Sequence, residues 1–184
     1  VSRYHGLVIV RAESGIRNFA GLEGKSFAYV PDTSAGELFT RLLLSKNGKA
    51  AERDFFSRVT RVSTHADAVQ MVAEGRVDGA AVKDLVLKRM IGERGKGGSH
   101  VLKDNIRVLE SSHLFPENAL VVSATLDPKQ SAKLRDILLS CDKKEAGRAA
   151  LKVLGAERFI RTEHEDYAKM YEMAQEAGYS FRKK

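Results

Sequence analysis

The alternation of short apolar runs with amphipathic runs is the feature that most restricts the fold of this chain. Strand-like runs occur at 6–12, 26–30, 58–63 and 77–82, with two more at 106–112 and 119–126. Helical spacing of apolar residues is found at 34–47, 65–75, 84–95, 128–141, 143–155 and 165–178. This order predicts an α/β fold with a mainly parallel sheet flanked by helices.

The composition excludes several classes of protein. The formal net charge is +7, but the basic residues are scattered and aromatic residues are not interleaved with them, so we expect no nucleic-acid partner. Apolar runs such as LVIV and ALVV are too short to span a bilayer, and we expect no direct membrane insertion of this segment. The single cysteine, Cys141, can form no intrachain disulfide, and no His/Cys cluster has the spacing of metal ligands. We therefore expect neither a metal nor an organic cofactor.

The stretch PDTSAGE, residues 31–37, joins an expected strand to an expected helix and allows two interpretations. In the first, Ser34 and Glu37 form a capping box, in which the hydroxyl and the carboxylate each accept a backbone N–H. In the second, small hydroxyl residues and a glycine at a helix N-terminus hold an oxyanion on free N–H groups. The same N–H groups can serve either acceptor.

Two further strand-to-helix junctions carry polar residues. Thr64 and His65 open one expected helix, and Val82, Lys83 and Asp84 form the junction before another. In parallel sheets, ligands bind at the carboxyl ends of strands, where helices begin. The three junctions are therefore expected to face one cleft.

Five segments together carry a family likeness. In chain order they are YHGLVIVRAESGI, LEGKSFAYVPDTSAGE, THADAVQMVAEGRVDGAAV, HLFPENALVV and EDYAKMYEMAQEAGY. They resemble the phosphonate/phosphite/phosphate substrate-binding proteins of ABC transporters, which have the type 2 periplasmic binding protein fold. The resemblance implies two α/β lobes that close on a ligand, with the N-terminal part of the first lobe apparently lacking. The implied domains are a crossing strand at 1–10, a second lobe at 11–115, and a return strand with C-terminal first-lobe helices at 116–184.

The resemblance also assigns ligand-binding residues. Tyr4 matches a ligand-contacting tyrosine, and the Ser–Thr–Ser–Gly loop that cradles phosphonate oxygens matches Thr33, Ser34, Ala35 and Gly36. His65 matches a histidine that donates to the oxyanion; a nearby anion would raise its pKa, so we expect it to contribute most to binding below about pH 6.5.

The chain departs from the family pattern at several positions. Gly6 replaces a serine, and Glu37 stands beside the anion loop, where a carboxylate is unfavourable unless it turns away. In the family, two acidic residues bind the amine of aminoalkylphosphonates. This chain has Leu85 and Asn118 at those positions, and Asp84 and Glu117 are the neighbouring acids that could replace them. We therefore expect a ligand without an amine, with Asn118 lining the site. The aspartate at Asp78 is expected to be structural.

The resemblance implies a binding protein rather than an enzyme. It would hold a phosphonate-, phosphite- or phosphate-like oxyanion and deliver it to the membrane subunits of an ABC transporter, in the periplasm or another extracytoplasmic space, with the signal sequence outside these residues. Ser34 and His65 could meet, but no acid orients a base toward a nucleophile, so no catalytic residue is expected. The alternatives are a ligand-sensing extracytoplasmic receptor domain on the same fold, and an effector domain of a DNA-linked regulator. The regulator would need a helix-turn-helix, which these residues do not contain.

Overall fold

The computed structural model describes residues 3–92, 100–117 and 119–179 of the 184-residue chain. These residues form two compact units. We call Ser2–Pro116 with Tyr167–Lys184 the sheet unit, and Glu117–Asp166 the helical unit.

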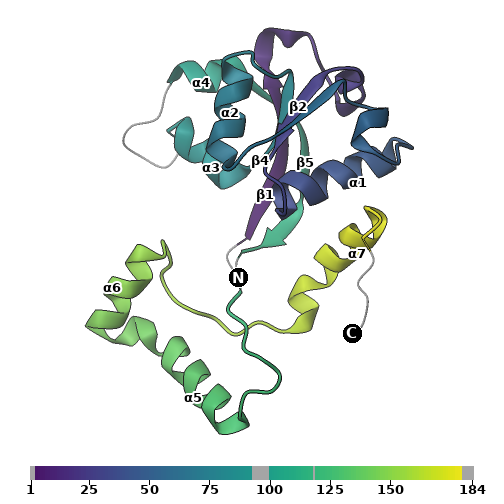
Figure 1. Cartoon of the computed structure of the whole chain (residues 1–184). Helices are drawn as coiled ribbons and strands as arrows, with labels where there is room; N and C mark the ends of the chain where they lie inside the picture. The colour runs from purple at the N-terminus through teal and green to yellow at the C-terminus, as the bar shows by residue number, and fades with distance from the viewer. Residues whose placement is uncertain (1–2, 93–99, 118, 180–184) are drawn as a thin grey trace. The chain divides into compact units, whose positions relative to one another are not determined.

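The sheet unit contains a five-stranded sheet in the order β3-β2-β4-β1-β5 (Figure 1). The strands are β1 (Arg3–Arg11), β2 (Ser26–Tyr29), β3 (Arg58–Arg61), β4 (Gly79–Lys83) and β5 (Ile106–Pro116). β2 pairs in parallel with both β3 and β4, whereas β1 runs antiparallel to β4 and to β5. The predicted α/β class is confirmed, and the sheet is mixed because its fourth strand, β1, is reversed.

Helices cover both faces of this sheet. They are α1 (Phe39–Lys46), α2 (His65–Ala73), α3 (Asp84–Met90), α4 (His100–Asn105) and α7 (Ala168–Glu176). A π-helical turn, Ser34–Leu38, leads into α1, and short 3-10 turns lie at Ala12–Ser14, Phe19–Leu22 and Glu52–Asp54. The helix expected at 84–95 ends earlier, at Met90, and its last residues fall partly outside the described part of the chain.

Alternating residues of the strands supply two separate cores. Val8, Val10, Phe27 and Tyr29 pack on one face with residues of α1 and α7, such as Phe39, Leu42 and Met173. Ile9, Ala28 and Val82 pack on the other face with residues of α2 and α3, such as Val69 and Leu87. Strand side chains point to opposite faces in turn, so the near-continuous apolar runs VIV and FAY feed both cores at once.

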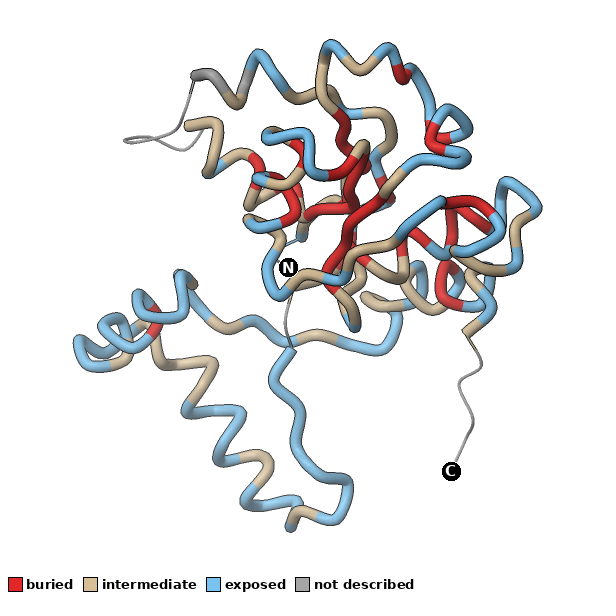
Figure 2. The backbone as a smooth tube through the Cα atoms, turned by 45° about the horizontal axis from the view of Figure 1, so that its top comes forward, coloured by how far each residue is buried: buried red, intermediate tan, exposed pale blue. Residues whose placement is uncertain are grey.

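The helical unit holds α5 (Pro128–Leu139) and α6 (Glu145–Val153), with 3-10 turns at Cys141–Lys143 and, at its end, His164–Tyr167. Its tube is exposed or half-buried over most of its length (Figure 2). Pro128 opens α5 and Asp127 caps it by accepting from the N–H groups of Lys129 and Gln130. Cys141 is half-buried.

The predicted strand at 119–126 is wrong. These residues form irregular structure, and Leu120 and Val121 are 65% and 83% exposed. A strand exists only when a neighbouring backbone takes its hydrogen bonds, and the apolar pattern says nothing about whether such a neighbour is there.

The units also divide the chain differently from the expected domains. Residues 3–11 form an interior strand of the sheet, because β1 pairs on both sides; their role as a crossing strand stays a prediction. Residues 167–184 belong to the sheet unit, where α7 contacts α1, rather than to the same unit as residues 117–166.

Candidate functional site

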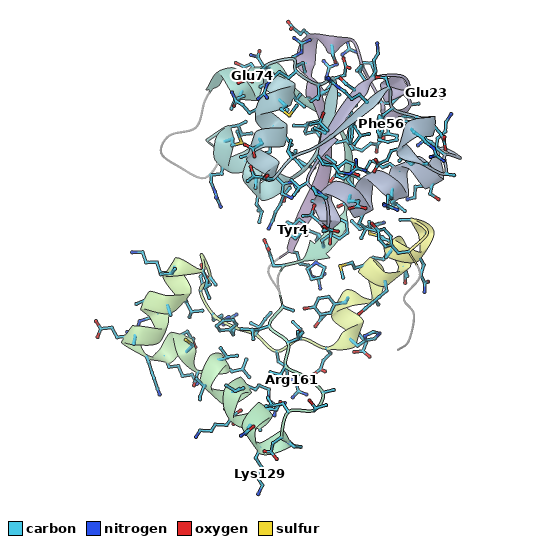
Figure 3. The ribbon with its side chains drawn as sticks, viewed as in Figure 1. Tyr4, Glu23, Phe56, Glu74, Lys129 and Arg161 are labelled. Atoms are coloured by element: carbon cyan, nitrogen blue, oxygen red, sulfur yellow. The ribbon has the colours of Figure 1, made fainter. Side chains whose placement is uncertain are left out.

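One edge of the sheet gathers the polar junctions of the sheet unit. β2, β3 and β4 are parallel, so their carboxyl ends share this edge, and the register Gly6↔Lys83 brings the start of β1 to it as well. Tyr4 accordingly lies at this end of the sheet (Figure 3). The π-helical turn Ser34–Leu38 contacts both β1 and β4. The structure therefore brings together the expected residues Tyr4, Thr33–Gly36 and His65.

The cap of the anion-loop helix is Thr33, so the expected Ser34–Glu37 box is wrong by one residue. Gly36 donates its N–H to Thr33 Oγ1 (3.1 Å), and the Thr33 hydroxyl donates to the carbonyl of Val30 (2.8 Å). The carboxylate of Glu37 also accepts a backbone N–H that precedes the helix, but the donor is Asp32 (2.9 Å). Asp32 has φ 55°, and this left-handed residue turns the chain early enough for Thr33 to become the cap.

Ser34 and Ala35 therefore occupy the first turn of the helix, where backbone N–H groups have no acceptor within the helix. The Ser34 hydroxyl is half-buried, with its closest polar contact at Met170 Sδ (3.8 Å), a weak acceptor. The side chain of Ala35 is buried, so this residue can offer a ligand only its backbone. The turn thus presents N–H groups and one weakly engaged hydroxyl, which suits an oxyanion.

Two glycines allow the turn to pack closely against the sheet. A Cβ on Gly36 would lie 2.4 Å from the carbonyl oxygen of Val30, so only glycine allows the turn to lie this close to the end of β2. A Cβ on Gly6 would lie 3.1 Å from Cα of Ala35. Gly6 stands where the family pattern has a serine, and the close approach of Ala35 explains why a side chain fits poorly there.

Glu37 stands beside the anion loop, but its carboxylate is engaged by partners of its own. Its oxygens accept from Arg41 Nη2 (2.7 Å) and from the hydroxyl of Tyr179 (3.2 Å) as well as from Asp32. Burial alone would raise the pKa of Glu37, but the hydrogen bonds from Asp32 and Arg41 outweigh it and leave this pKa lowered. The charge is therefore held by its own partners.

His65 begins α2 directly after its cap, Thr64, whose hydroxyl oxygen accepts from the N–H of Asp67 (3.1 Å). Burial and the nearby charge of Lys83 lower the pKa of His65 to about 4, although the backbone of Ala81 acts in the opposite direction. Without a ligand the ring is thus neutral at pH 6.5, and the rise of its pKa beside a bound anion stays a prediction. Its Nδ1 atom is buried and has no hydrogen-bond partner within the described residues.

Lys83 belongs to a junction that the sequence placed at this edge, although the sequence assigned the residue no role of its own. It ends β4, and its Nζ lies 4.2 Å from the ring centroid of Tyr4, within range of a cation–π contact. The Tyr4 ring packs on Phe115, with centroids 5.7 Å apart. The sequence feature that points to Lys83 is a basic residue at the carboxyl end of a strand, a position where ligands bind.

The acids near this edge have structural roles. Asp84 is buried and accepts from the N–H of His5 (3.0 Å) and from Lys88 Nζ (2.9 Å). Asp78, at the opposite edge, accepts from the N–H and the hydroxyl of Ser26 (2.8 and 2.6 Å), which confirms the structural role expected for it.

The predicted site residue Asn118 lies outside the described residues.

A cavity of about 340 Å³ lies elsewhere in the sheet unit. Its lining combines α1, β5 and α7 and includes Leu42, Leu43, Glu110, His113 and Met173, but none of the expected ligand-binding residues. Within residues 3–92, 100–117 and 119–179, no three His, Cys, Asp or Glu side chains cluster as metal ligands.

No helix in the described part of the chain combines the length and the apolar character that crossing a bilayer requires.

Comparison with known proteins agrees with this geometry. A family model described as ABC transporter, phosphonate, periplasmic substrate-binding protein matches residues 1–167. Three solved structures share the fold. A Xanthomonas citri protein bound to chloride ion has a TM-score of 0.79 and 20% identity, over 97% of this chain and 66% of that one. A binding protein component of a Pseudomonas aeruginosa ABC phosphonate transporter has a TM-score of 0.75 and 20% identity, over 97% of this chain and 59% of that one.

The third structure is PhnD1 of Prochlorococcus marinus in complex with methylphosphonate, with a TM-score of 0.72 and 16% identity. The alignment covers 96% of this chain and 67% of that one. The chain thus spans about three fifths to two thirds of the length of these structures.

Proposed function

Since this chain belongs to the periplasmic phosphonate substrate-binding family of ABC transporters, we propose that it binds a phosphonate-, phosphite- or phosphate-like oxyanion and delivers it to transporter subunits in the membrane. The family match covers residues 1–167 and agrees with the resemblance drawn from the sequence. We propose that it does so outside the cytoplasm.

One observation carries the proposal: donors from separate elements meet at one edge of the sheet. The turn after β2 offers first-turn N–H groups and the Ser34 hydroxyl, and β1 and β4 offer Tyr4 and Lys83. His65, at the start of α2, would donate to the ligand only as the charged ring, which a bound anion favours. Hydrogen-bond donors and positive charge are what an oxyanion needs to leave water without a large penalty. The carboxylates of Glu37 and Asp84, which would repel an anion, are bound to partners of their own.

The same geometry gives no support to a hydrolytic reaction. A serine nucleophile needs a base within hydrogen-bond reach, but the polar contact of the Ser34 hydroxyl is the thioether of Met170. His65 interacts with the backbone of Ala81. We therefore propose binding without chemistry, and no described feature favours the sensory or the regulatory alternative.

Calorimetric titration of the full-length protein with methylphosphonate, phosphite, phosphate and sulfate tests the proposal. We expect at least one phosphorus oxyanion to bind, and Ser34→Ala to weaken it about tenfold to a hundredfold, because one hydrogen bond to a charged group is lost. Ser45→Ala, an exposed serine near the other end of α1, is the matched control and should leave affinity unchanged. If Ser34→Ala lowers only the stability of the fold, the turn is a cap and not a site.

A further inference from the structure

We propose that Glu37 is a positioning residue of the oxyanion site: its carboxylate holds Asp32 in a left-handed conformation, and this conformation fixes where the helix after the turn begins. The inference rests on the proposed function, because it concerns how the Thr33–Gly36 turn is kept ready for an oxyanion. It goes beyond that function by giving a carboxylate, which by its charge would only repel the ligand, a role in binding it.

The backbone of Asp32 carries the first step. Among the non-glycine residues that the structure describes, Asp32 is the one with a positive φ, at 55°. This conformation is unfavourable for a residue with a Cβ, although aspartate tolerates it better than most, so the surroundings must hold it. It allows the next residue, Thr33, to cap the helix by accepting the N–H of Gly36 (3.1 Å). If Asp32 relaxed, the cap would move, and the first-turn N–H groups of Ser34 and Ala35 would move with it.

The two carboxylate oxygens of Glu37 have different partners. Oε2 accepts the N–H of Asp32 (2.9 Å), the backbone group of the left-handed residue itself. Oε1 accepts from Nη2 of Arg41 (2.7 Å) and from the hydroxyl of Tyr179 (3.2 Å). The guanidinium of Arg41 also lies over the Tyr179 ring, 5.1 Å from its centroid. The bonds to Oε1 therefore fix the carboxylate, and the bond to Oε2 fixes Asp32.

These anchors come from two helical segments outside the turn. Arg41 belongs to α1, and Tyr179 follows α7. The hydroxyl of Ser34 lies 3.8 Å from Sδ of Met170 in α7, so the C-terminal segment contacts the turn at two points. The side chain of Glu37 is 14% exposed, which limits competition from water. Burial would raise the pKa of Glu37, but the hydrogen bonds from the turn and from Arg41 leave it lowered, so the acceptor is charged at neutral pH.

The change in affinity expected on removing this carboxylate has an unusual sign. Loss of a negative charge beside an anion site ordinarily strengthens binding, because a repulsion disappears. Glu37→Ala should instead weaken binding about tenfold, because Asp32 relaxes and the first-turn N–H groups move. Glu37→Gln keeps an acceptor oxygen for Asp32 and removes the charge, so it should bind at least as tightly as the wild type.

Calorimetric titration of the full-length protein with methylphosphonate and with phosphate measures these affinities. Asp32→Gly added to Glu37→Ala is the direct test, since glycine adopts a positive φ without a steric penalty and should restore most of the lost affinity. A merely structural loss at Glu37 would not be repaired by that glycine. Glu74→Ala is the matched control: this carboxylate accepts from Arg76 Nε (2.6 Å) at the C-terminal end of α2, and its loss should leave affinity unchanged.

A measurement without ligand follows the same bond. Exchange of the Asp32 amide proton, measured by NMR, should be about tenfold faster in Glu37→Ala than in the wild type, because the N–H loses its acceptor. Glu37→Gln should keep the slow exchange. If Glu37→Ala does not fold, Glu37→Asp replaces it: the shorter side chain keeps the charge but cannot reach both Asp32 and Arg41, and the same losses are expected.

The outcomes separate the role of Glu37 from the proposed function. If the wild type binds methylphosphonate or phosphate, but Glu37→Ala binds equally or more tightly or the added Asp32→Gly restores nothing, the role of Glu37 is refuted and the proposed function stands. Equal exchange rates at Asp32 would refute it as well. If the folded wild-type protein binds neither of these ligands nor phosphite, both proposals fail. Circular dichroism of each variant establishes that a lost affinity does not come from misfolding.

Discussion

The sheet unit and the helical unit treat the same kinds of side chain in opposite ways. In the sheet unit, Val8 and Phe27 are completely buried, whereas in the helical unit Val121 and Val153 are 83% and 87% exposed. Among the described residues of the helical unit, Leu151 is the buried large hydrophobic side chain. A sheet offers two broad faces that helices can cover, but two short helices bury only what they can place against each other.

The difference teaches where the stability of the described structure comes from. Burial of apolar area is the dominant favourable contribution to folding, and it is concentrated around the five strands. The candidate site lies at the ends of the same strands, so the stable core positions the site. The predictions below test this contrast between the units, from the largest expected effect to the smallest.

The largest effect is expected from truncating a core side chain of the sheet unit. Phe27 is fully buried and stacks on Phe56 with ring centroids 4.4 Å apart, so Phe27→Ala should lower the free energy of unfolding by about 3–5 kcal/mol. Leu134→Ala in α5 should cost less than about 1 kcal/mol, because that side chain is 44% exposed. Urea denaturation followed by circular dichroism measures both, and equal losses would erase the contrast between the units.

A somewhat smaller loss is expected at the anion turn. Gly36→Ala would place a methyl group 2.4 Å from the carbonyl oxygen of Val30, and we expect a loss of about 2–4 kcal/mol as the turn moves off β2. Oxyanion affinity should fall together with stability. Gly21→Ala is the control, since its new methyl group would meet the side chain of Ile16 at 3.1 Å and not a backbone atom. An unchanged Gly36→Ala protein would show that the turn is not held in this position.

A pH-dependent effect is expected from His65. Its folded pKa of about 4 lies below the ordinary value of 6.5, so the unfolded chain takes up the proton first as the pH falls. Stability should therefore be lost between about pH 6.5 and pH 4, by about 2–3 kcal/mol.

His65→Gln removes this titration, so the variant should lose less stability than the wild type over the same range. Urea denaturation at pH 7 and at pH 4.5 gives the comparison. Glu37 adds a loss of the same sign in acid, because its pKa is also lowered, but that loss is common to both proteins. Parallel pH curves for the two proteins would mean that the ring of His65 is not buried as described.

The smallest effects are expected in the helical unit. Val121→Ser and Val153→Ser should each change the free energy of unfolding by less than about 0.5 kcal/mol, because these side chains are mostly exposed. Binding of a fluorescent apolar dye should weaken, since large exposed apolar groups attract it. Val69→Ser, in the core under α2, is the contrasting variant and should be strongly destabilised. A loss above 1 kcal/mol for Val121→Ser would show that polypeptide covers it in the natural protein.

The sequence was sufficient to predict the elements whose signal is local. The strands around Val8, Phe27 and Val82 and the helices that start at His65 and Pro128 follow from apolar spacing and caps. The reversed direction of β1 could not be predicted, because it depends on pairing with residues 79–83 and 106–116, far along the chain. The strand expected at 119–126 failed for a related reason: strand pattern is local, but a pairing partner is not.

The site divides in the same way. Tyr4 and His65 were predicted through motif order and stay predictions, and the cap was misplaced because the left-handed turn at Asp32 shifts the helix start by one residue. The sequence placed Lys83 at a junction but could not predict its contact with Tyr4, because the two residues lie 79 positions apart in the chain. The lowered pKa of His65 likewise depends on burial and on Lys83, which a helix-start motif does not report.

The interior position of β1 has a consequence for how this chain folds during synthesis. β1 is synthesised before its partners β4 and β5, which end only at Lys83 and Pro116. Until Pro116 has emerged, the sheet cannot be completed and the apolar run LVIV stays exposed to water. Contacts between residues so far apart in the chain also form slowly. We expect β1 to remain unpaired and prone to aggregation over this interval, and to depend on a chaperone that keeps it from associating with other chains.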